Sequence, residues 1–155
     1  MIKLLLSFKY AFQGFFFCVR TCRNYRIHTV AAALVLFVNS FFDRTPAETA
    51  LIMLTIALVL TAEAFNCSLE QISDAVTVER EIHIQHAKDA AAAAVLSIAL
   101  FSVAIAAVMF SNVQSLLAAW HAVTCAPWRV ALLVLAAVAS ILYIFYEDIF
   151  FHGKK

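Results

Sequence analysis

Long apolar runs, interrupted by few charged residues, are the feature that most limits what this chain can fold into. Hydrophobic residues make up 65% of the 155 positions, and charged residues make up only 14%. A soluble globular domain averages about 45–50% apolar and about 25% charged residues, so this chain has too little polar surface for a fold in water. The composition therefore predicts an integral membrane protein.

Composition and charge also argue against several classes of function. The only glycines are Gly14 and Gly153, so no glycine-rich loop is available for a P-loop or a Rossmann nucleotide site. The net charge is +1 and the eleven Lys and Arg residues are scattered, so we expect no nucleic-acid partner. The four cysteines contain no C-x-x-C pair, and we expect them to be buried or reduced thiols.

The positions of the apolar runs predict an all-α integral membrane fold. The segment at about residues 2–21 is apolar but carries Lys3, Lys9 and Arg20 toward one side, which is typical of an amphipathic helix in the membrane interface. Because about 20 residues cross the hydrocarbon core, four spans are expected. They lie at about residues 25–42, 47–66, 90–110 and 130–151.

The distribution of Lys and Arg predicts the orientation of these spans. If the N-terminus is cytoplasmic, all basic residues except Arg44 and Arg129 fall on the cytoplasmic side. This bias follows the positive-inside rule. It predicts that both termini are cytoplasmic, and that the loop at about residues 74–89 faces the cytoplasm, where ATP is available.

A stripe of polar residues begins at the end of the second expected span. Its members are spaced at i, i+3, i+7 and i+11, which gathers them on one face of an α-helix. They are Glu63, Asn66, Glu70 and Asp74. An ionisable group inside a span is costly, so the stripe is a candidate functional site. The alternative is that the stripe is only the water-facing end of a long helix.

A second polar feature opens the third expected span, where Lys88 and Asp89 precede five alanines. The start of a helix has free N–H groups and a partial positive charge, so a neighbouring lysine makes it suitable for a phosphate. The alanines allow another helix to approach closely. The alternative is that Lys88 and Asp89 only anchor the helix at the membrane surface.

Together these features resemble a known family. The pattern E-x-x-N-x-x-x-E-x-x-x-D, followed by K-D and a run of small residues, is similar to the prokaryotic diacylglycerol kinase and undecaprenol kinase family of small integral-membrane lipid kinases. The resemblance covers about residues 3–115. The segments Ser7–Gly14 and Arg23–His28 resemble the undecaprenol kinase branch in particular.

The resemblance implies a homotrimer in the bacterial inner membrane, with active sites shared between subunits. Each subunit would have one surface helix and three spans, and would transfer the γ-phosphoryl group of ATP to a lipid hydroxyl. Residues 1–115 would then form the lipid kinase domain, and residues 116–155 would be an extension that carries the fourth span. Undecaprenol is favoured as the substrate because of the Arg23–His28 segment, with diacylglycerol as the alternative.

The resemblance also implies roles for individual residues. Glu63 would be the general base, Asn66 would orient the site, and Glu70 would bind the Mg²⁺ that accompanies ATP. The nucleotide side would consist of Lys88, Asp89, Asp74 and Glu79. Because phosphoryl transfer depends on positioning and charge stabilisation, one base, one Mg²⁺-binding carboxylate and one lysine form a sufficient set.

Two departures from the family pattern favour a reading from another class, a non-catalytic four-helix membrane protein or small pore. Cys22 stands where many members have a second metal-binding glutamate, and a thiol is a poor ligand for Mg²⁺. The tyrosine and histidine of the family's cytoplasmic loop fall here on Arg80 and Glu81, with His83 as a candidate substitute.

Overall fold

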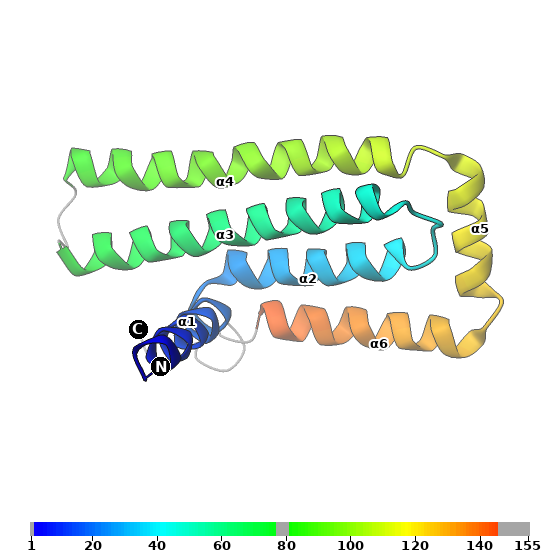
Figure 1. Ribbon diagram of the computed structural model, residues 1–155, viewed down its shortest axis with the longest axis horizontal. Coiled ribbons are helices and arrows are strands. Elements are labelled where there is room, and N and C mark those ends of the chain that lie inside the picture. The colour runs from blue at the N-terminus through cyan, green and yellow to red at the C-terminus, as the bar shows by residue number, and fades with distance from the viewer. Residues whose placement is uncertain (1, 77–80, 146–155) are drawn as a thin grey trace.

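The structure is a computed structural model, and it describes residues 2–76 and 81–145. All regular structure in this part of the chain is helical, which confirms the predicted all-α fold (Figure 1). The helices are α1 (Ile2–Thr21), α2 (Arg23–Asn39), α3 (Pro46–Val76), α4 (Ile82–Met109), α5 (Val113–Thr124) and α6 (Pro127–Ile144).

Four of the helices form a bundle. α2, α3, α4 and α6 lie along a common direction, with α3 packed between α2 and α4, and α6 packed against α2 (Figure 1). α1 crosses one end of the bundle and α5 crosses the other end. If the bundle spans the membrane, α1 therefore lies along the membrane surface, as the amphipathic pattern of residues 2–21 predicts.

Three helices in the described part are long and apolar enough to cross a membrane: α3, α4 and α6. This finding supports the predicted membrane protein. α2 has 17 residues and is not among these three helices. At about 1.5 Å per residue it is about 26 Å long, close to the thickness of the hydrocarbon core. The predicted span at residues 25–42 thus stays a prediction.

Several helix boundaries differ from those expected for the spans. α3 continues to Val76, and α4 begins at Ile82, so the polar stripe and Lys88 lie on helices that extend beyond the apolar runs. α6 begins at Pro127, and part of the expected span at residues 130–151 falls outside the described residues.

α5 was not predicted, because its apolar pattern covers only 12 residues. A local signal for its start is nevertheless present in the sequence. Asn112 caps the helix, and its Oδ1 accepts a hydrogen bond from the backbone N–H of Ser115. Asparagine is among the preferred residues at a helix N-cap.

Most large apolar side chains point outward, including Phe101 and Leu135, which are 72% and 65% exposed. This arrangement suits a bundle surrounded by lipid. The buried residues gather instead where α1, α2 and α3 meet, around Cys18, Tyr25 and Cys67.

Arg26 is also buried at this end of the bundle, at 2% exposure. Its Nη1 donates to the carbonyl of Arg20 at 2.7 Å, and its Nε donates to the carbonyl of Ile144 at 3.3 Å. The side chain therefore links the end of α1 and the end of α6 to α2.

Candidate active site

The candidate site is built around the buried carboxylate of Glu63 on α3. Glu63 is 2% exposed, and its Oε1 lies 3.1 Å from Nε2 of His28 on α2. Burying a charged group is costly unless it is paired or hydrogen-bonded, and the contact with His28 supplies that partner. Glu63 is therefore held in one position at the α2–α3 interface and is not a solvated end of the helix.

Asn66 and Glu70 continue the same face of α3. Nδ2 of Asn66 donates a hydrogen bond to Oε1 of Glu70 at 3.1 Å. Asn66 is 6% exposed, and its Oδ1 is buried without a hydrogen-bond partner among the described residues. The pair thus fixes the Glu70 carboxylate and presents a free amide oxygen beside it.

These three residues line a small pocket, which we call the polar pocket. Its volume is about 160 Å³. α3 forms one wall, and the junction between α1 and α2 forms the other. Its lining consists of Thr21, Cys22, Arg23, Asn24, Glu63, Asn66, Cys67, Glu70 and Gln71. The structure therefore brings the predicted residues Glu63, Asn66 and Glu70 together with Cys22.

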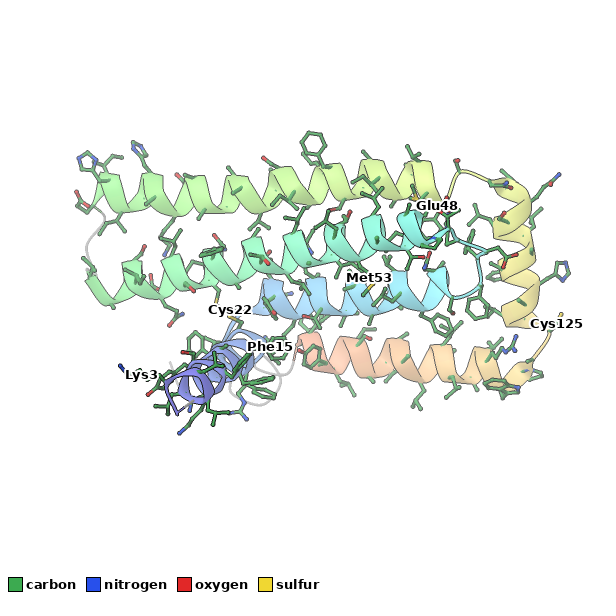
Figure 2. All side chains as sticks on the ribbon, in the orientation of Figure 1. Lys3, Phe15, Cys22, Glu48, Met53 and Cys125 are labelled. Atoms are coloured by element: carbon green, nitrogen blue, oxygen red, sulfur yellow. A yellow bond between two sulfur atoms is a disulfide. The ribbon has the colours of Figure 1, made fainter. Side chains whose placement is uncertain are left out.

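Cys22 and Cys67 are joined by a disulfide, which links the α1–α2 junction to α3 (Figure 2). The expectation that all four cysteines are buried or reduced thiols is wrong for this pair. The sequence separation of 45 residues explains the error, because only the packing of α1 and α2 on α3 brings the two residues together. Cys18 and Cys125 are free thiols.

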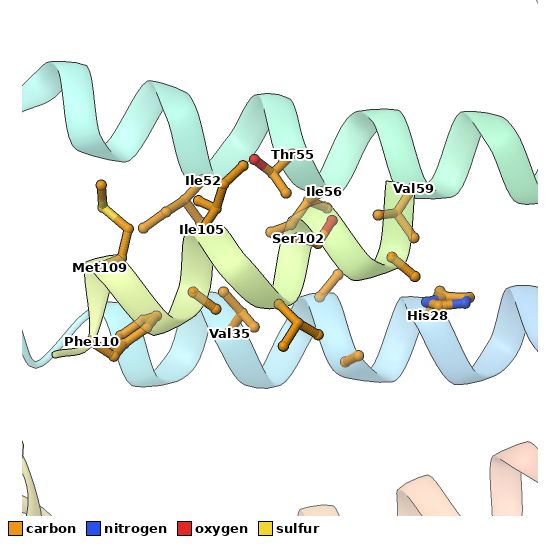
Figure 3. A pocket seen from close by; sticks show the side chains of 15 residues that line it. His28, Val35, Ile52, Thr55, Ile56, Val59, Ser102, Ile105, Met109 and Phe110 are labelled. Carbon is orange, nitrogen blue, oxygen red and sulfur yellow. The ribbon is translucent and has the colours of Figure 1, made fainter. Parts of the chain in front are cut away.

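A second, apolar cavity lies between α2, α3 and α4. Its volume is about 310 Å³, and it runs from Met109 and Phe110 at one end to His28 at the other (Figure 3). Its walls are almost entirely aliphatic, including Val35, Ile56 and Val59. Because His28 lines this cavity and contacts Glu63, Glu63 stands between the apolar cavity and the polar pocket.

The predicted nucleotide-side residues lie further along α3 and α4. Nζ of Lys88 is 2.9 Å from Oδ1 of Asp74, and this ion pair joins the two helices. Asp89 is exposed next to it. None of these three residues is among those that line the polar pocket. The fourth, Glu79, lies outside the described residues.

Comparison with known proteins decides the family. The sequence profile described as prokaryotic diacylglycerol kinase matches residues 9–110. The chain belongs to the prokaryotic diacylglycerol kinase family. The matched region includes α2, α3 and α4 and therefore every residue that lines the polar pocket and the apolar cavity. It ends before α5 and α6.

Two relatives carry different substrate names within this family. A protein of Synechocystis sp. named diacylglycerol kinase is 38% identical over 103 residues, which cover 65% of this chain and 58% of that protein. A protein of Bacillus subtilis named undecaprenol kinase is 33% identical over 108 residues, which cover 70% of this chain and 88% of that protein. No solved structure shows a significant match.

Sequence reasoning assigned no catalytic or binding role to His28, which contacts Glu63. A usable signal was present, because His28 is the only titratable residue in the apolar stretch of residues 27–42. An ionisable residue in such a stretch is a functional candidate by default. The contact with Glu63 could not be read from the sequence, since it depends on the rotation of α2 against α3.

Proposed function

We propose that this protein is a kinase of a membrane lipid alcohol, which transfers the γ-phosphoryl group of ATP to the lipid hydroxyl. The observation that carries this proposal is the position of Glu63 between two chemically different spaces. An apolar cavity on one side suits a hydrocarbon chain, and a polar pocket on the other side suits a phosphoryl group. Family membership supports the same reaction class.

In this mechanism the part of the lipid chain next to the hydroxyl occupies the apolar cavity, and the hydroxyl lies beside Glu63. The carboxylate of Glu63 accepts the hydroxyl proton while the oxygen attacks the γ-phosphorus. General-base help of this kind contributes about 10²–10⁴-fold to a rate. His28 holds the carboxylate in place, and Asn66 does the same for Glu70.

Mg²⁺ is the metal that the reaction implies, and the donors in the polar pocket fit it. Glu70 and the unpartnered Oδ1 of Asn66 are oxygen donors, as Mg²⁺ requires, and one or two protein ligands are sufficient when phosphate and water supply the rest. When bound, Mg²⁺ would neutralise charge on the phosphates. Cys22 is bonded to Cys67 and is not available as a second ligand.

ATP would bind where α3 and α4 extend beyond the apolar runs. Lys88 is the donor for phosphate oxygens, with Asp89 and Asp74 beside it, and Glu79 completes this set by family resemblance. Oδ1 of Asp74 lies 2.9 Å from Nζ of Lys88. ATP phosphates would compete with Asp74 for the ammonium group.

For the substrate we favour undecaprenol, because the Arg23–His28 segment resembles the undecaprenol kinase branch and contributes His28 to the site. Diacylglycerol is the second candidate, supported by the name of the Synechocystis relative. We further propose a homotrimer in the bacterial inner membrane with both termini cytoplasmic. The many outward-facing apolar side chains of α4 and α6 leave ample surface for lipid and for neighbouring subunits.

The test is phosphate incorporation from Mg-ATP into undecaprenol or diacylglycerol in mixed micelles, measured with the reduced protein. Glu63→Gln keeps the shape of the side chain but removes the base, and we expect it to lower kcat by about 10²–10⁴-fold. Asp43→Asn is the matched control, since Asp43 is an exposed carboxylate at the opposite end of the bundle. We expect this variant to retain full activity.

The outcomes separate the candidate functions. Transfer to one lipid, lost in Glu63→Gln and retained in Asp43→Asn, supports the kinase and identifies its substrate. A folded, reduced wild-type protein that phosphorylates neither lipid would instead favour the non-catalytic membrane protein. Mg-ATP should also raise the thermal stability of a kinase by mass action, and it should leave a pore unchanged.

A further inference from the structure

The Cys22–Cys67 disulfide lies inside the candidate active site. Cys67 follows Asn66 directly and stands one helical turn after Glu63 on α3. Cys22 is the N-cap of α2, with an extended backbone at φ −102° and ψ 106°. The Cα atoms of the two cysteines are 6.2 Å apart, within the usual range for a disulfide. Both residues line the polar pocket.

The bond ties a lightly held part of the fold to the catalytic helix. Most side chains of α1 are exposed, and its buried contact with α3 is the small cluster around Cys18 and Cys67. The disulfide adds a covalent link between the α1–α2 junction and α3. With this link in place, the two walls of the polar pocket cannot separate at Cys22.

The size of the polar pocket indicates which state the disulfide stabilises. Sites for small-molecule ligands usually have volumes of about 300–1,000 Å³. The disulfide-linked pocket measures about 160 Å³, so it has room for a phosphoryl group but is smaller than the usual range for a whole ligand. Movement of the α1–α2 junction away from α3 would enlarge it, and that movement requires separate Cys22 and Cys67.

We propose that Cys22 and Cys67 form a reversible thiol-oxidation site that closes the polar pocket when it is oxidised and opens it when it is reduced. This inference rests on the proposed kinase function for its effect on activity. Cys22 is partly exposed and gives an oxidant access, whereas Cys67 is 1% exposed and completes the bond from within the structure.

The chemistry is a balanced two-electron exchange. With a peroxide as oxidant, the two thiols lose two electrons and two protons to form one S–S bond, and hydrogen peroxide is reduced to two water molecules. With a small dithiol as reductant, exchange through a mixed disulfide returns both protein thiols and leaves the reductant as its own disulfide.

The two free cysteines provide matched controls. Cys125 is exposed at the opposite end of the bundle, between α5 and α6. Cys18 lies in α1 close to the pair, but its side chain is buried. Burial raises the pKa of the Cys18 thiol, so less of it is in the reactive thiolate form. Replacing either residue should leave the oxidation of Cys22 and Cys67 intact.

The first experiment counts free thiols and does not depend on kinase activity. Purified protein in detergent is treated with hydrogen peroxide or with dithiothreitol, unfolded, and labelled with a maleimide polymer that retards each labelled thiol on a gel. We expect four labels on the reduced protein and two on the oxidised protein. Cys22→Ser and Cys67→Ser should each show three labels after reduction and no internal disulfide after oxidation. Four labels on the oxidised wild-type protein would overturn the inference.

The second experiment measures lipid phosphorylation in the same samples. We expect oxidation to lower the activity of the wild type, Cys18→Ser and Cys125→Ser by at least about tenfold, and dithiothreitol to restore it. The ratio of reduced to oxidised activity should fall to about one in Cys22→Ser and Cys67→Ser, whatever their basal rates. Equal activity of the reduced and the fully disulfide-linked wild type would overturn the inference. No activity in the reduced wild type would count against the proposed function and not against the disulfide.

Discussion

At the scale of single residues, the buried polar groups show both how the helices pack and where the candidate active site lies. Among the described residues, the buried polar or charged side chains are those of Arg26, Glu63 and Asn66, and all three lie near the α1–α2 junction. Burial of polar groups costs free energy unless partners compensate. Their partners come from other helices or from neighbouring side chains, so each group also reports how the helices are packed. The same residues lie in or beside the candidate active site.

The contact between His28 and Glu63 gives a prediction at this scale. His28→Ala removes the partner of a buried carboxylate, and we expect it to lower the free energy of unfolding by about 1–3 kcal/mol. We also expect a large decrease in kcat and a smaller change in the KM for either substrate, because the base loses its orientation. Kinetics and thermal unfolding in detergent measure both effects. His28→Gln retains a donor and should recover part of kcat, whereas equal losses in both variants would argue against a positioning role.

At the scale of elements, α3 and α4 carry most of the proposed site residues because both helices continue beyond their apolar runs. The extension of α3 holds Glu70 and Asp74, and the first turns of α4 hold Lys88. Their antiparallel packing brings Asp74 and Lys88 together across 14 residues of chain. The helix pair thus connects the polar pocket with the predicted nucleotide side.

Lys88→Met tests this connection. The ion pair with Asp74 is exposed, and exposed ion pairs contribute little to stability, so we expect almost no change in thermal unfolding. The KM for Mg-ATP should rise by about tenfold or more, because a charge-assisted hydrogen bond to phosphate is lost. Steady-state kinetics at varied Mg-ATP measures this rise. An unchanged KM would remove Lys88 from the nucleotide site.

At the scale of the whole molecule, the family region and the C-terminal helices are distinct. The match ends at residue 110, and α5 and α6 follow it. α6 packs against α2. At the end of the bundle near the candidate active site, the carbonyl of Ile144 accepts a hydrogen bond from Arg26. At the same end, Cζ of Arg23 lies 4.6 Å from the ring centroid of Phe145. These contacts brace the α1–α2 junction, but neither α6 nor Phe145 contributes a residue to the lining of the polar pocket.

A truncation after Cys125 tests the role of α6. We expect this variant to keep most of its lipid kinase activity, because the lining residues of both cavities lie within the family region. Its thermal stability should fall, since a hydrogen bond from a charged group contributes about 1.5–3 kcal/mol and Arg26 loses one. Activity assays and thermal unfolding of the truncated protein measure the two effects. Loss of activity in a truncated protein that remains folded would show that α6 is part of the functional unit.

The sequence by itself determined the features that depend on local order along the chain. The apolar runs determined the helices other than α5, and the spacing of Glu63, Asn66 and Glu70 placed these residues on one face of an α-helix with its 3.6-residue period. Only the tertiary structure decided the contact of His28 with Glu63, the disulfide of Cys22 with Cys67, and the two cavities. These features depend on how helices distant in sequence rotate and pack against one another, and helical periodicity leaves that choice open.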